Sequence, residues 1–140
     1  MSNNYTVDIL TPSKIIAQNV PAESLLVPTV AGQINVLKDH THVISKLETG
    51  IITIFGGAED ADRFFSVSYG TCKVLNNKIT ILANTSEESK HINVERAQMA
   101  LKRAEEILYK SDGMDDDEIL KYQRKLERAK LRLQLVSYKG

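Results

Sequence analysis

Two stretches within residues 92–136 carry apolar side chains at every third or fourth position, and nothing before residue 90 shows this period. The positions are Val94, Ala97, Leu101, Ala104 and Leu108, then Ile119, Tyr122, Leu126, Ala129, Leu133 and Val136. This spacing places each set on one face of an α-helix, and such a face needs a partner to cover it. The segment between the two stretches is short and contains Gly113. The sequence therefore predicts an antiparallel helical hairpin.

Composition limits the classes of protein to which the chain can belong. With 18 basic and 18 acidic residues, the overall charge gives no reason to expect binding to nucleic acid or to a membrane. A single cysteine, Cys72, excludes an internal disulfide and fits a reducing compartment. No apolar run approaches the roughly 20 residues that span a bilayer, and residues 1–5 lack a targeting pattern. We expect any membrane association to occur only through a partner.

Residues 1–88 are expected to be β-structure, because short runs rich in Val, Ile, Thr, Phe and Tyr alternate with turn signals. Short, evenly spaced strands are typical of a sandwich or flattened barrel. Asn76-Asn77 predicts a tight hairpin, and Tyr69-Gly70 predicts a further turn. The expected strands cover residues 5–10, 14–19, 24–28, 33–37, 43–47, 50–55, 63–68, 71–75 and 78–83. The predicted fold is α+β, with a β-sandwich domain over residues 1–88 and a helical hairpin domain over 89–140.

The β region offers little evidence of catalytic or metal chemistry. Asp39-His40-Thr41-His42 brings two imidazoles and a carboxylate together, but no further ligands follow at a suitable spacing, so we expect no metal there. These histidines are better explained by packing or by contact with a partner protein. Cys72 has no cationic neighbour except Lys73, which disfavours a catalytic thiol. Gly56-Gly57 has no following Lys-Ser/Thr, which excludes a phosphate loop of that type.

Several motifs together resemble the epsilon subunit of the F-type ATP synthase, of the bacterial or plastid type. Residues 27–40 are similar to that family's Gly-x-x-x-(Leu/Val)-Leu-x-x-His loop, and Leu47-Glu-Thr-Gly50 follows at the expected distance. Residues 65–74 and 79–83 match the family's last sheet strands. Ile92-Asn-Val-Glu-Arg-Ala97 resembles the Ile/Leu-Asp-x-x-Arg-Ala signature at the start of the first helix. The resemblance covers nearly the whole chain.

The resemblance implies a non-catalytic rotor subunit of a proton-translocating ATP synthase. In this family the sandwich contacts the gamma subunit and the polar loops of the c-ring. The hairpin either folds onto the sandwich or extends into the alpha/beta catalytic head and blocks ATP hydrolysis. The implied location is peripheral, at the cytoplasmic face of the bacterial inner membrane or the stromal face of a thylakoid. The ring and stalk interface would include Gly32, Gln33, His40 and His42, with Gln33 replacing a frequent acid and His42 a frequent proline.

The resemblance also implies that ATP binds the folded hairpin as a regulatory ligand, although no cofactor is required. The matching positions are Glu87, Asn93, Arg96, Ala97, Arg103, Arg128 and Arg132. Arg128 and Arg132 are four residues apart and share a helix face, and antiparallel packing would bring Arg103 near them. Guanidinium groups suit phosphate oxygens. The alternative is that these arginines are solvated surface residues, whose ion pairs are weak.

A basic surface on the second helix is the predicted inhibitory element. It consists of Lys121, Arg124, Lys125, Arg128 and Arg132, here called the basic stripe. The resemblance implies that the basic stripe docks on acidic loops of the catalytic head, and the alternative is again a solvated face. Asp115-Asp-Asp117 is expected to cap the second helix, because it lacks the ligand spacing of a calcium loop. The competing function is a free-standing ATP-sensing module whose hairpin closes on nucleotide, and a hydrolase is disfavoured because no nucleophile–base set is present.

Overall fold

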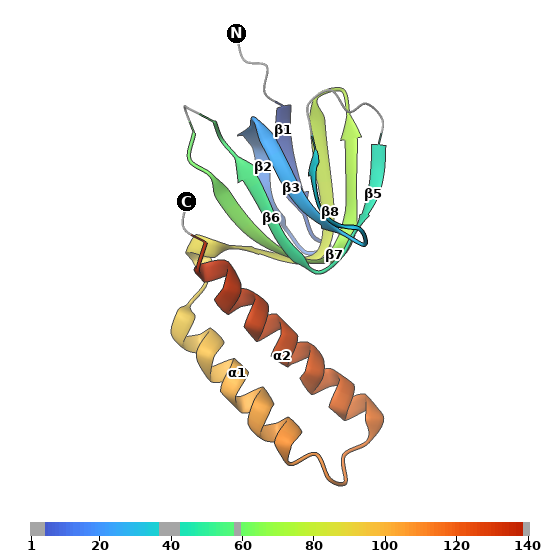
Figure 1. The fold of residues 1–140 in the computed structure, drawn as a ribbon, viewed down its shortest axis with the longest axis vertical. Helices are drawn as coiled ribbons and strands as arrows, with labels where there is room; N and C mark the ends of the chain where they lie inside the picture. The colour runs from blue at the N-terminus through green and yellow to red at the C-terminus, as the bar shows by residue number, and fades with distance from the viewer. Residues whose placement is uncertain (1–4, 37–42, 58–59, 139–140) are drawn as a thin grey trace.

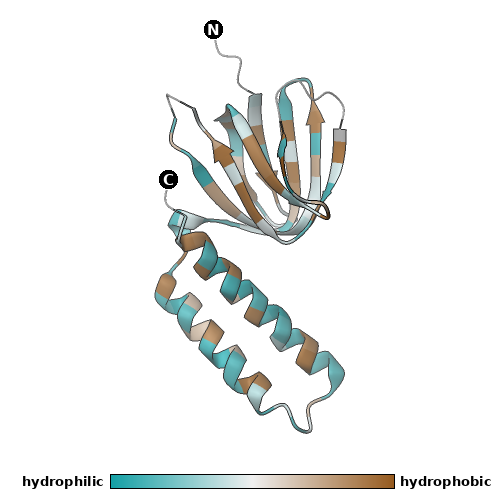
Figure 2. Ribbon diagram, viewed as in Figure 1, coloured by the Kyte–Doolittle hydropathy of each residue, from teal (hydrophilic) through white to brown (hydrophobic). Residues whose placement is uncertain are grey.

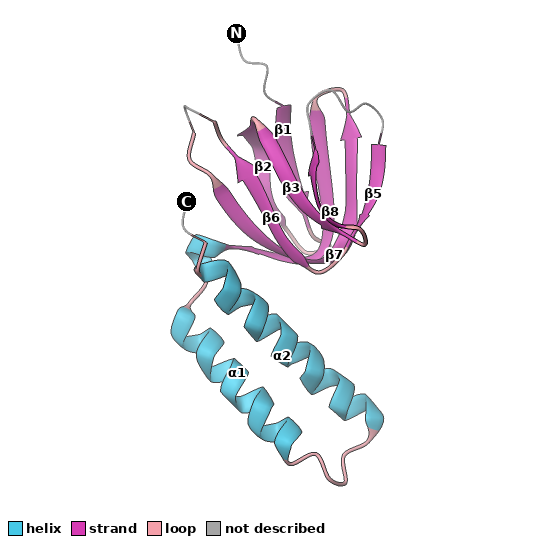
Figure 3. Cartoon of the chain, viewed as in Figure 1, coloured by secondary structure: helices cyan, strands magenta, loops and turns pink. Residues whose placement is uncertain are grey.

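The computed structural model describes residues 5–36, 43–57 and 60–138 of the 140-residue chain. His40 and His42 therefore lie outside the described residues. The strands are β1 (Tyr5–Leu10), β2 (Ile15–Ala22), β3 (Ser24–Thr29), β4 (Gly32–Val36), β5 (Val43–Leu47), β6 (Gly50–Phe55), β7 (Arg63–Leu75) and β8 (Lys78–Glu88). They are followed by the short 3₁₀ helix η1 (Ser89–His91) and by the helices α1 (Val94–Tyr109) and α2 (Asp116–Val136). Figure 3 shows that the strands and the helices occupy separate parts of the molecule.

The strands form one curled sheet in the order β2-β1-β8-β7-β6-β3-β4, with β5 paired to β7 outside this path. All described pairs are antiparallel except β1 with β8. The long strand β7 pairs with β6 along its first half and with β5 along its second half. The register does not shift between the two halves, as the pairs Gly50↔Val67 and Leu47↔Gly70 show. The sheet therefore folds over itself into a flattened barrel (Figure 1), which confirms the predicted all-β sandwich.

The interior of the barrel is filled by alternate side chains of the strands. The largest of these include Tyr5, Ile9, Leu25, Ile52 and Phe65, all fully buried. The Tyr5 hydroxyl donates a hydrogen bond to the carbonyl oxygen of Val36 and so joins β1 to the end of β4. Burial, together with nearby Cys72, raises the pKa of Tyr5 to about 12. The phenol therefore stays protonated and remains a donor at any ordinary pH.

The predicted turn at Tyr69-Gly70 is wrong, because β7 continues without interruption from Arg63 to Leu75. Gly70 is needed here for a close approach, since a Cβ at this position would lie 2.0 Å from the carbonyl oxygen of Leu82. Tyr69 takes a φ of 29°, so the strand absorbs a local irregularity instead of turning. The predicted hairpin at Asn76-Asn77 is confirmed, with φ values of 50° and 64°.

The two helices lie side by side and antiparallel below the barrel (Figure 1), which confirms the predicted hairpin. Asn93 caps α1 by accepting a 3.0 Å hydrogen bond from the Arg96 N–H, and Asp115 caps α2 by accepting a 2.8 Å bond from the Glu118 N–H. Small side chains set the close packing between the helices: Ala97, Ala104 and Ala129 are all buried. In Figure 2 the helices are mostly hydrophilic with separate apolar bands, whereas the strands carry longer apolar runs.

The C-terminal end of α2 packs against the barrel through a second apolar surface that the helical period did not reveal. Leu135 is fully buried there in a cluster with Ile51 of β6 and Phe64 of β7. Ile92, Leu131 and Tyr138 pack around this cluster, and the Phe64 and Tyr138 ring centroids are 5.4 Å apart. We call this group the docking cluster. It holds the hairpin against the sandwich at one end only.

Candidate functional site

Glu87, near the end of β8, connects the sandwich to the hairpin electrostatically. Its Oε1 accepts a hydrogen bond of 2.6 Å from Nε of Arg132, and Nη2 of Arg128 lies 3.7 Å from the same oxygen. Glu87 and Arg132 are each 28% exposed, so this pair is partly shielded from water. A charge-assisted bond of this kind is stronger than a fully exposed ion pair. Glu87 therefore holds Arg132 and lies close to Arg128, and all three are predicted nucleotide-site residues.

The next residue, Glu88, points to a different partner. Arg63 binds it with two parallel hydrogen bonds of 2.8 Å, and Nζ of Lys90 lies at 3.9 Å. Burial raises the pKa of Glu88, but the hydrogen bonds and charge of Arg63, with smaller help from Lys90 and His91, outweigh it and lower the pKa below its ordinary value. Glu88 is thus a structural carboxylate, already satisfied, while Glu87 faces the helices.

Two adjoining cavities lie along the hairpin near Glu87, and we call them together the hairpin cavities. One, of about 330 Å³, lies between the helices, and the other, of about 380 Å³, lies at the start of α1. They share Ala100 and Arg132. The first is lined by Arg103 and Arg128 as well, and the second by Glu87, Asn93 and Arg96. Six of the seven predicted nucleotide-site residues therefore meet in these cavities, whereas Ala97 is buried and lines neither of them.

The hairpin cavities also contain residues that the sequence did not assign to the nucleotide site. Tyr122 and Lys125 line the first cavity, and His91 lines the second. Nζ of Lys125 lies 5.1 Å from the centre of the Tyr122 ring, and Nζ of Lys121 lies 5.7 Å from it. The period assigned Tyr122 to the apolar seam, and only the packing of the helices shows that its ring also faces a cavity.

The electrostatic character of the hairpin cavities is cationic. Four arginines and Lys125 line them, against the single carboxylate of Glu87. Asn93 lines the second cavity and uses its side-chain oxygen to cap α1, which leaves its amide N–H groups as donors. In the described part of the chain, no group of three or more His, Cys, Asp or Glu could hold a metal ion. This arrangement suits the binding of a polyanion.

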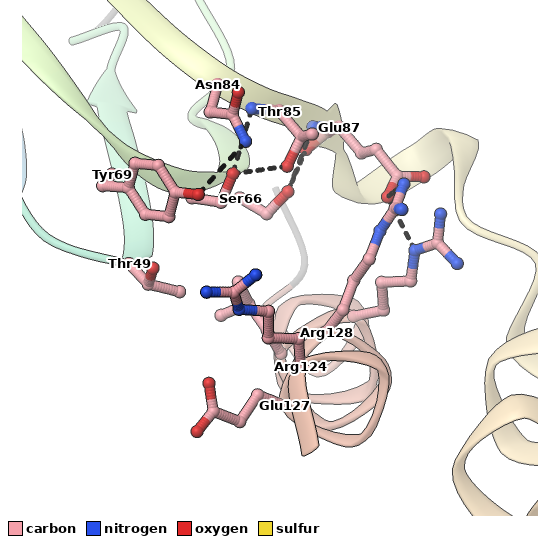
Figure 4. Close-up of a pocket in the computed structure, with 12 residues that line it drawn as sticks. Thr49, Ser66, Tyr69, Asn84, Thr85, Glu87, Arg124, Glu127 and Arg128 are labelled. Atoms are coloured by element: carbon pink, nitrogen blue, oxygen red, sulfur yellow. Dashed lines mark hydrogen bonds and ion pairs between the residues drawn. The ribbon is translucent and has the colours of Figure 1, made fainter. Parts of the chain in front are cut away.

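The basic stripe lies on the surface of α2 between the side that faces α1 and the side that faces the sheet. One side of α2 faces α1 through Ala129, and another faces the sheet through Leu131 and Leu135. The stripe runs between these sides, because Arg128 and Arg132 reach Glu87 while Lys121 and Lys125 lie at the Tyr122 ring. The remaining member, Arg124, lines a third cavity, which lies between α2 and the strands (Figure 4).

The two described residues of the predicted ring interface lie close to the docked end of the hairpin. Gly32, with a φ of 104°, and Gln33 are exposed at the start of β4. Both line a cleft of about 330 Å³ that also contains Leu131, Gln134 and Tyr138 from the end of the chain. His40 and His42 are not among the described residues, so this predicted interface is only partly described.

Comparison with known proteins assigns the family. Residues 4–89 match the model for the β-sandwich domain of the ATP synthase delta/epsilon chain, and residues 90–137 match the model for its long α-helix domain. The ATP synthase epsilon chains of Staphylococcus aureus strains JH9 and Newman are each 33% identical over 137 residues, which covers 98% of this chain and 99% of theirs. The chain belongs to the delta/epsilon family of ATP synthase subunits. Its resemblance to F-type epsilon subunits is confirmed over its full length.

Solved structures confirm the fold. A chain in the cryo-EM structure of the Euglena gracilis mitochondrial ATP synthase, OSCP/F1/c-ring, has a TM-score of 0.64 at 17% identity, covering 98% of this chain and 79% of that one. A chain in the Tetrahymena thermophila mitochondrial ATP synthase central stalk and c-ring structure has a TM-score of 0.53 at 14% identity, covering 94% and 95%. Among the described residues, no helix is long and apolar enough to cross a membrane.

Proposed function

We propose that this chain is a non-catalytic subunit of the central stalk of a rotary, proton-translocating ATP synthase, and that its hairpin regulates ATP hydrolysis. In this proposal the sandwich contacts the gamma subunit and the polar loops of the c-ring, and the released hairpin contacts the alpha/beta head. Membrane association is peripheral and runs through the complex. Support comes from the relatives, which are named ATP synthase epsilon chains, and from the similar structures, which are described as central stalk or F1/c-ring assemblies.

The observation that carries this proposal is the small size of the contact between hairpin and sandwich. Among the described residues, Leu135 is the only fully buried side chain that the helices contribute to this contact, and burying one leucine contributes about 1.5–3 kcal/mol. The partly exposed Arg132–Glu87 pair adds about 1 kcal/mol. A docking free energy of a few kcal/mol suits an element that a ligand or a partner releases.

We further propose that ATP binds weakly in the hairpin cavities and favours the docked hairpin. The phosphates would contact the arginines of α1 and α2, which come from both helices and therefore require the folded hairpin. Equilibrium dialysis of the full chain against ATP tests this proposal. The variant Arg103→Gln removes a cavity arginine and should weaken ATP uptake, whereas Lys102→Gln, an exposed neighbour outside the cavities, should not. Equal uptake by both variants would contradict the assignment.

The regulatory role is tested in the assembled complex. A chain lacking residues 91–140 should still co-purify with the gamma subunit, because the sandwich core lies within β1 to β8. The complex that contains it should hydrolyse ATP faster than the complex with the full chain. Failure of the shortened chain to join the stalk would show that the hairpin is needed for assembly and would overturn the division of roles.

The second candidate function is a free-standing ATP-sensing module, since the cationic cavities are built entirely from this chain. Co-purification separates the two functions. A stalk subunit elutes with gamma after gentle lysis, whereas a free sensor elutes as a lone chain and still binds ATP. Elution as a lone chain would therefore reject the stalk assignment.

A further inference from the structure

A third cavity, of about 280 Å³, opens between α2 and the sheet (Figure 4), and we call it the wedge. Its strand wall includes Ser68 and Tyr69 of β7 with Thr85 of β8. Its helix wall includes Arg124, Arg128 and Leu131. Leu131 also belongs to the docking cluster, so the wedge begins where the docked contact ends. It is a space bounded by two elements that the docked hairpin brings together.

The strand wall of the wedge carries more hydrogen-bond donors than its own bonds use. The hydroxyls of Ser68 and Thr85 lie 2.6 Å apart, and the Thr85 N–H donates to Ser68 Oγ at 3.0 Å. Two hydroxyl protons serve one mutual bond, so one proton is left to donate outward whichever hydroxyl is the donor. The Tyr69 hydroxyl is approached by the Asn84 amide nitrogen at 3.5 Å, and its own proton is likewise left over.

The helix wall adds cationic donors. The guanidinium group of Arg124 forms no hydrogen bond or ion pair with other residues in the described ranges, and in Figure 4 the side chain extends toward the strand wall. Arg128 has only a 3.7 Å contact with Glu87, whose oxygen already accepts the shorter bond from Arg132. The carboxylate of Glu127 points away from the strands (Figure 4). Surplus donors of both kinds therefore face the wedge.

Backbone strain occurs at the same place. Tyr69 is a non-glycine residue with a φ of 29°, and its side chain is 57% exposed although it lies within a strand. Strained backbone is retained where the surrounding structure fixes it, and it often marks a ligand site. This residue belongs to the strand wall of the wedge, and the helix wall across the cavity carries the arginines.

We propose that the wedge binds a phosphate-type oxyanion, with inorganic phosphate as its simplest member. Guanidinium groups of Arg124 and Arg128 would supply charge, and hydroxyls of the strand wall would supply neutral donors. Because its ligand contacts α2 and the sheet together, the site stabilises the docked hairpin. It adjoins the hairpin cavities and shares Glu87, Arg128 and Arg132 with them, whereas Arg124 and Tyr69 line only the wedge among these three cavities.

Two-dimensional NMR titration of the full chain with inorganic phosphate tests this proposal, with sodium chloride at matched ionic strength as the reference. Saturable shifts are expected at amides 66–69, 84–85 and 124–131. Arg124→Gln should weaken phosphate binding at least about tenfold, because a charge-assisted donor is lost. Tyr69→Phe should also weaken it, whereas Lys102→Gln and Tyr109→Phe, which lie outside the wedge and the hairpin cavities, should leave it unchanged. All four side chains are exposed, so the variants should fold.

Several results would overturn the assignment. Equal amide shifts in sodium chloride would mean that the shifts arise from ionic strength and not from phosphate binding. Unchanged binding by Arg124→Gln, or shifts centred on residues 93–103, would place the anion elsewhere. Displacement of phosphate by ATP with an affinity that depends on Arg103 would show that the wedge is not a separate site. None of these results bears on the stalk assignment, which depends on co-purification with gamma.

Discussion

Substituting Leu135 tests most directly how the hairpin is held. Leu135 is fully buried between Ile51 and Phe64, so Leu135→Ala removes apolar contact and leaves a cavity. Buried Leu→Ala substitutions cost about 2–5 kcal/mol. The docking cluster is small, and its outer members Leu131 and Tyr138 are only partly buried, so the site can relax and the lower end, about 2–3 kcal/mol, is expected. The undocked fraction then rises by roughly 30- to 150-fold.

Hydrogen exchange of the α2 amides measures this change. A two-helix hairpin without tertiary packing is marginally stable in water, so undocking should appear as faster exchange over residues 128–136. Amides of the barrel core, such as those of Ile79 and Ile81, should keep their protection, which separates undocking from global unfolding. Leu120→Ala is the matched control, because Leu120 lies on the same helix, is 45% exposed and lies outside the docking cluster.

The same pair of variants connects docking to function. If the released hairpin is the inhibitory form, complexes with Leu135→Ala should hydrolyse ATP more slowly than complexes with Leu120→Ala. Identical exchange in the two variants would refute the docking argument, since it would mean that burial of Leu135 contributes nothing to the contact. Faster exchange without a change in hydrolysis would instead refute the inhibitory role.

Three further predictions concern the sandwich. Because folding lowers the pKa of Glu88, this carboxylate stabilises the protein above its ordinary pKa of 4.5, and the stabilisation is lost as the pH falls through the lower folded pKa. Denaturant midpoints measured against pH should show this loss, and the loss should be smaller in Glu88→Gln. Burial raises the pKa of the Cys72 thiol to about 11, so about one thiol in a thousand is ionised at pH 8, and alkylation should be slow until the protein unfolds; rapid labelling of the native protein would contradict this. Gly70→Ala should destabilise the protein by several kcal/mol, because the added Cβ would meet the Leu82 carbonyl. Gly113 has open space around it and a φ of 88°, so Gly113→Ala should cost only about 1 kcal/mol. Equal thermal midpoints of the two variants would contradict the close approach at Gly70.

The order of strands and helices could be read from the sequence because it depends on local periodicity. Asn76 and Asn77 accept positive φ at low cost, so their turn was predictable from two residues. The role of Gly70 was not predictable in this way, because a glycine needed for close approach to the next strand has the same local signature as a glycine needed for a turn. The distinction depends on the Leu82 carbonyl, which is twelve residues away in the sequence.

The docked face and the candidate site required the tertiary structure. Helical period identifies the strongest apolar stripe of α2, and Leu131 and Leu135 form a second, shorter stripe beside it. Their spacing of four residues was the available signal, but it does not say which surface covers them. The pairing of Glu87 with Arg132 depends on β8 running to Glu88, well past the predicted end at Ala83. The resemblance to the family assigned both residues to one site, and the length of β8 explains how Glu87 reaches Arg132.

The position of the basic stripe explains how a weak ligand could control this hairpin. Arg128 and Arg132 cannot bind Glu87 and an external acidic surface at once, so docking and attachment to a partner compete for the same charges. A ligand that binds only the docked form stabilises it by RT ln(1 + [L]/Kd), which is about 1.4 kcal/mol at ten times Kd. An increment of that size lowers the released fraction about tenfold, and it is a large part of the few kcal/mol that the docking cluster supplies. High affinity is therefore unnecessary. A site that fills only when its ligand is abundant would make the docked fraction of α2 depend on the ligand concentration.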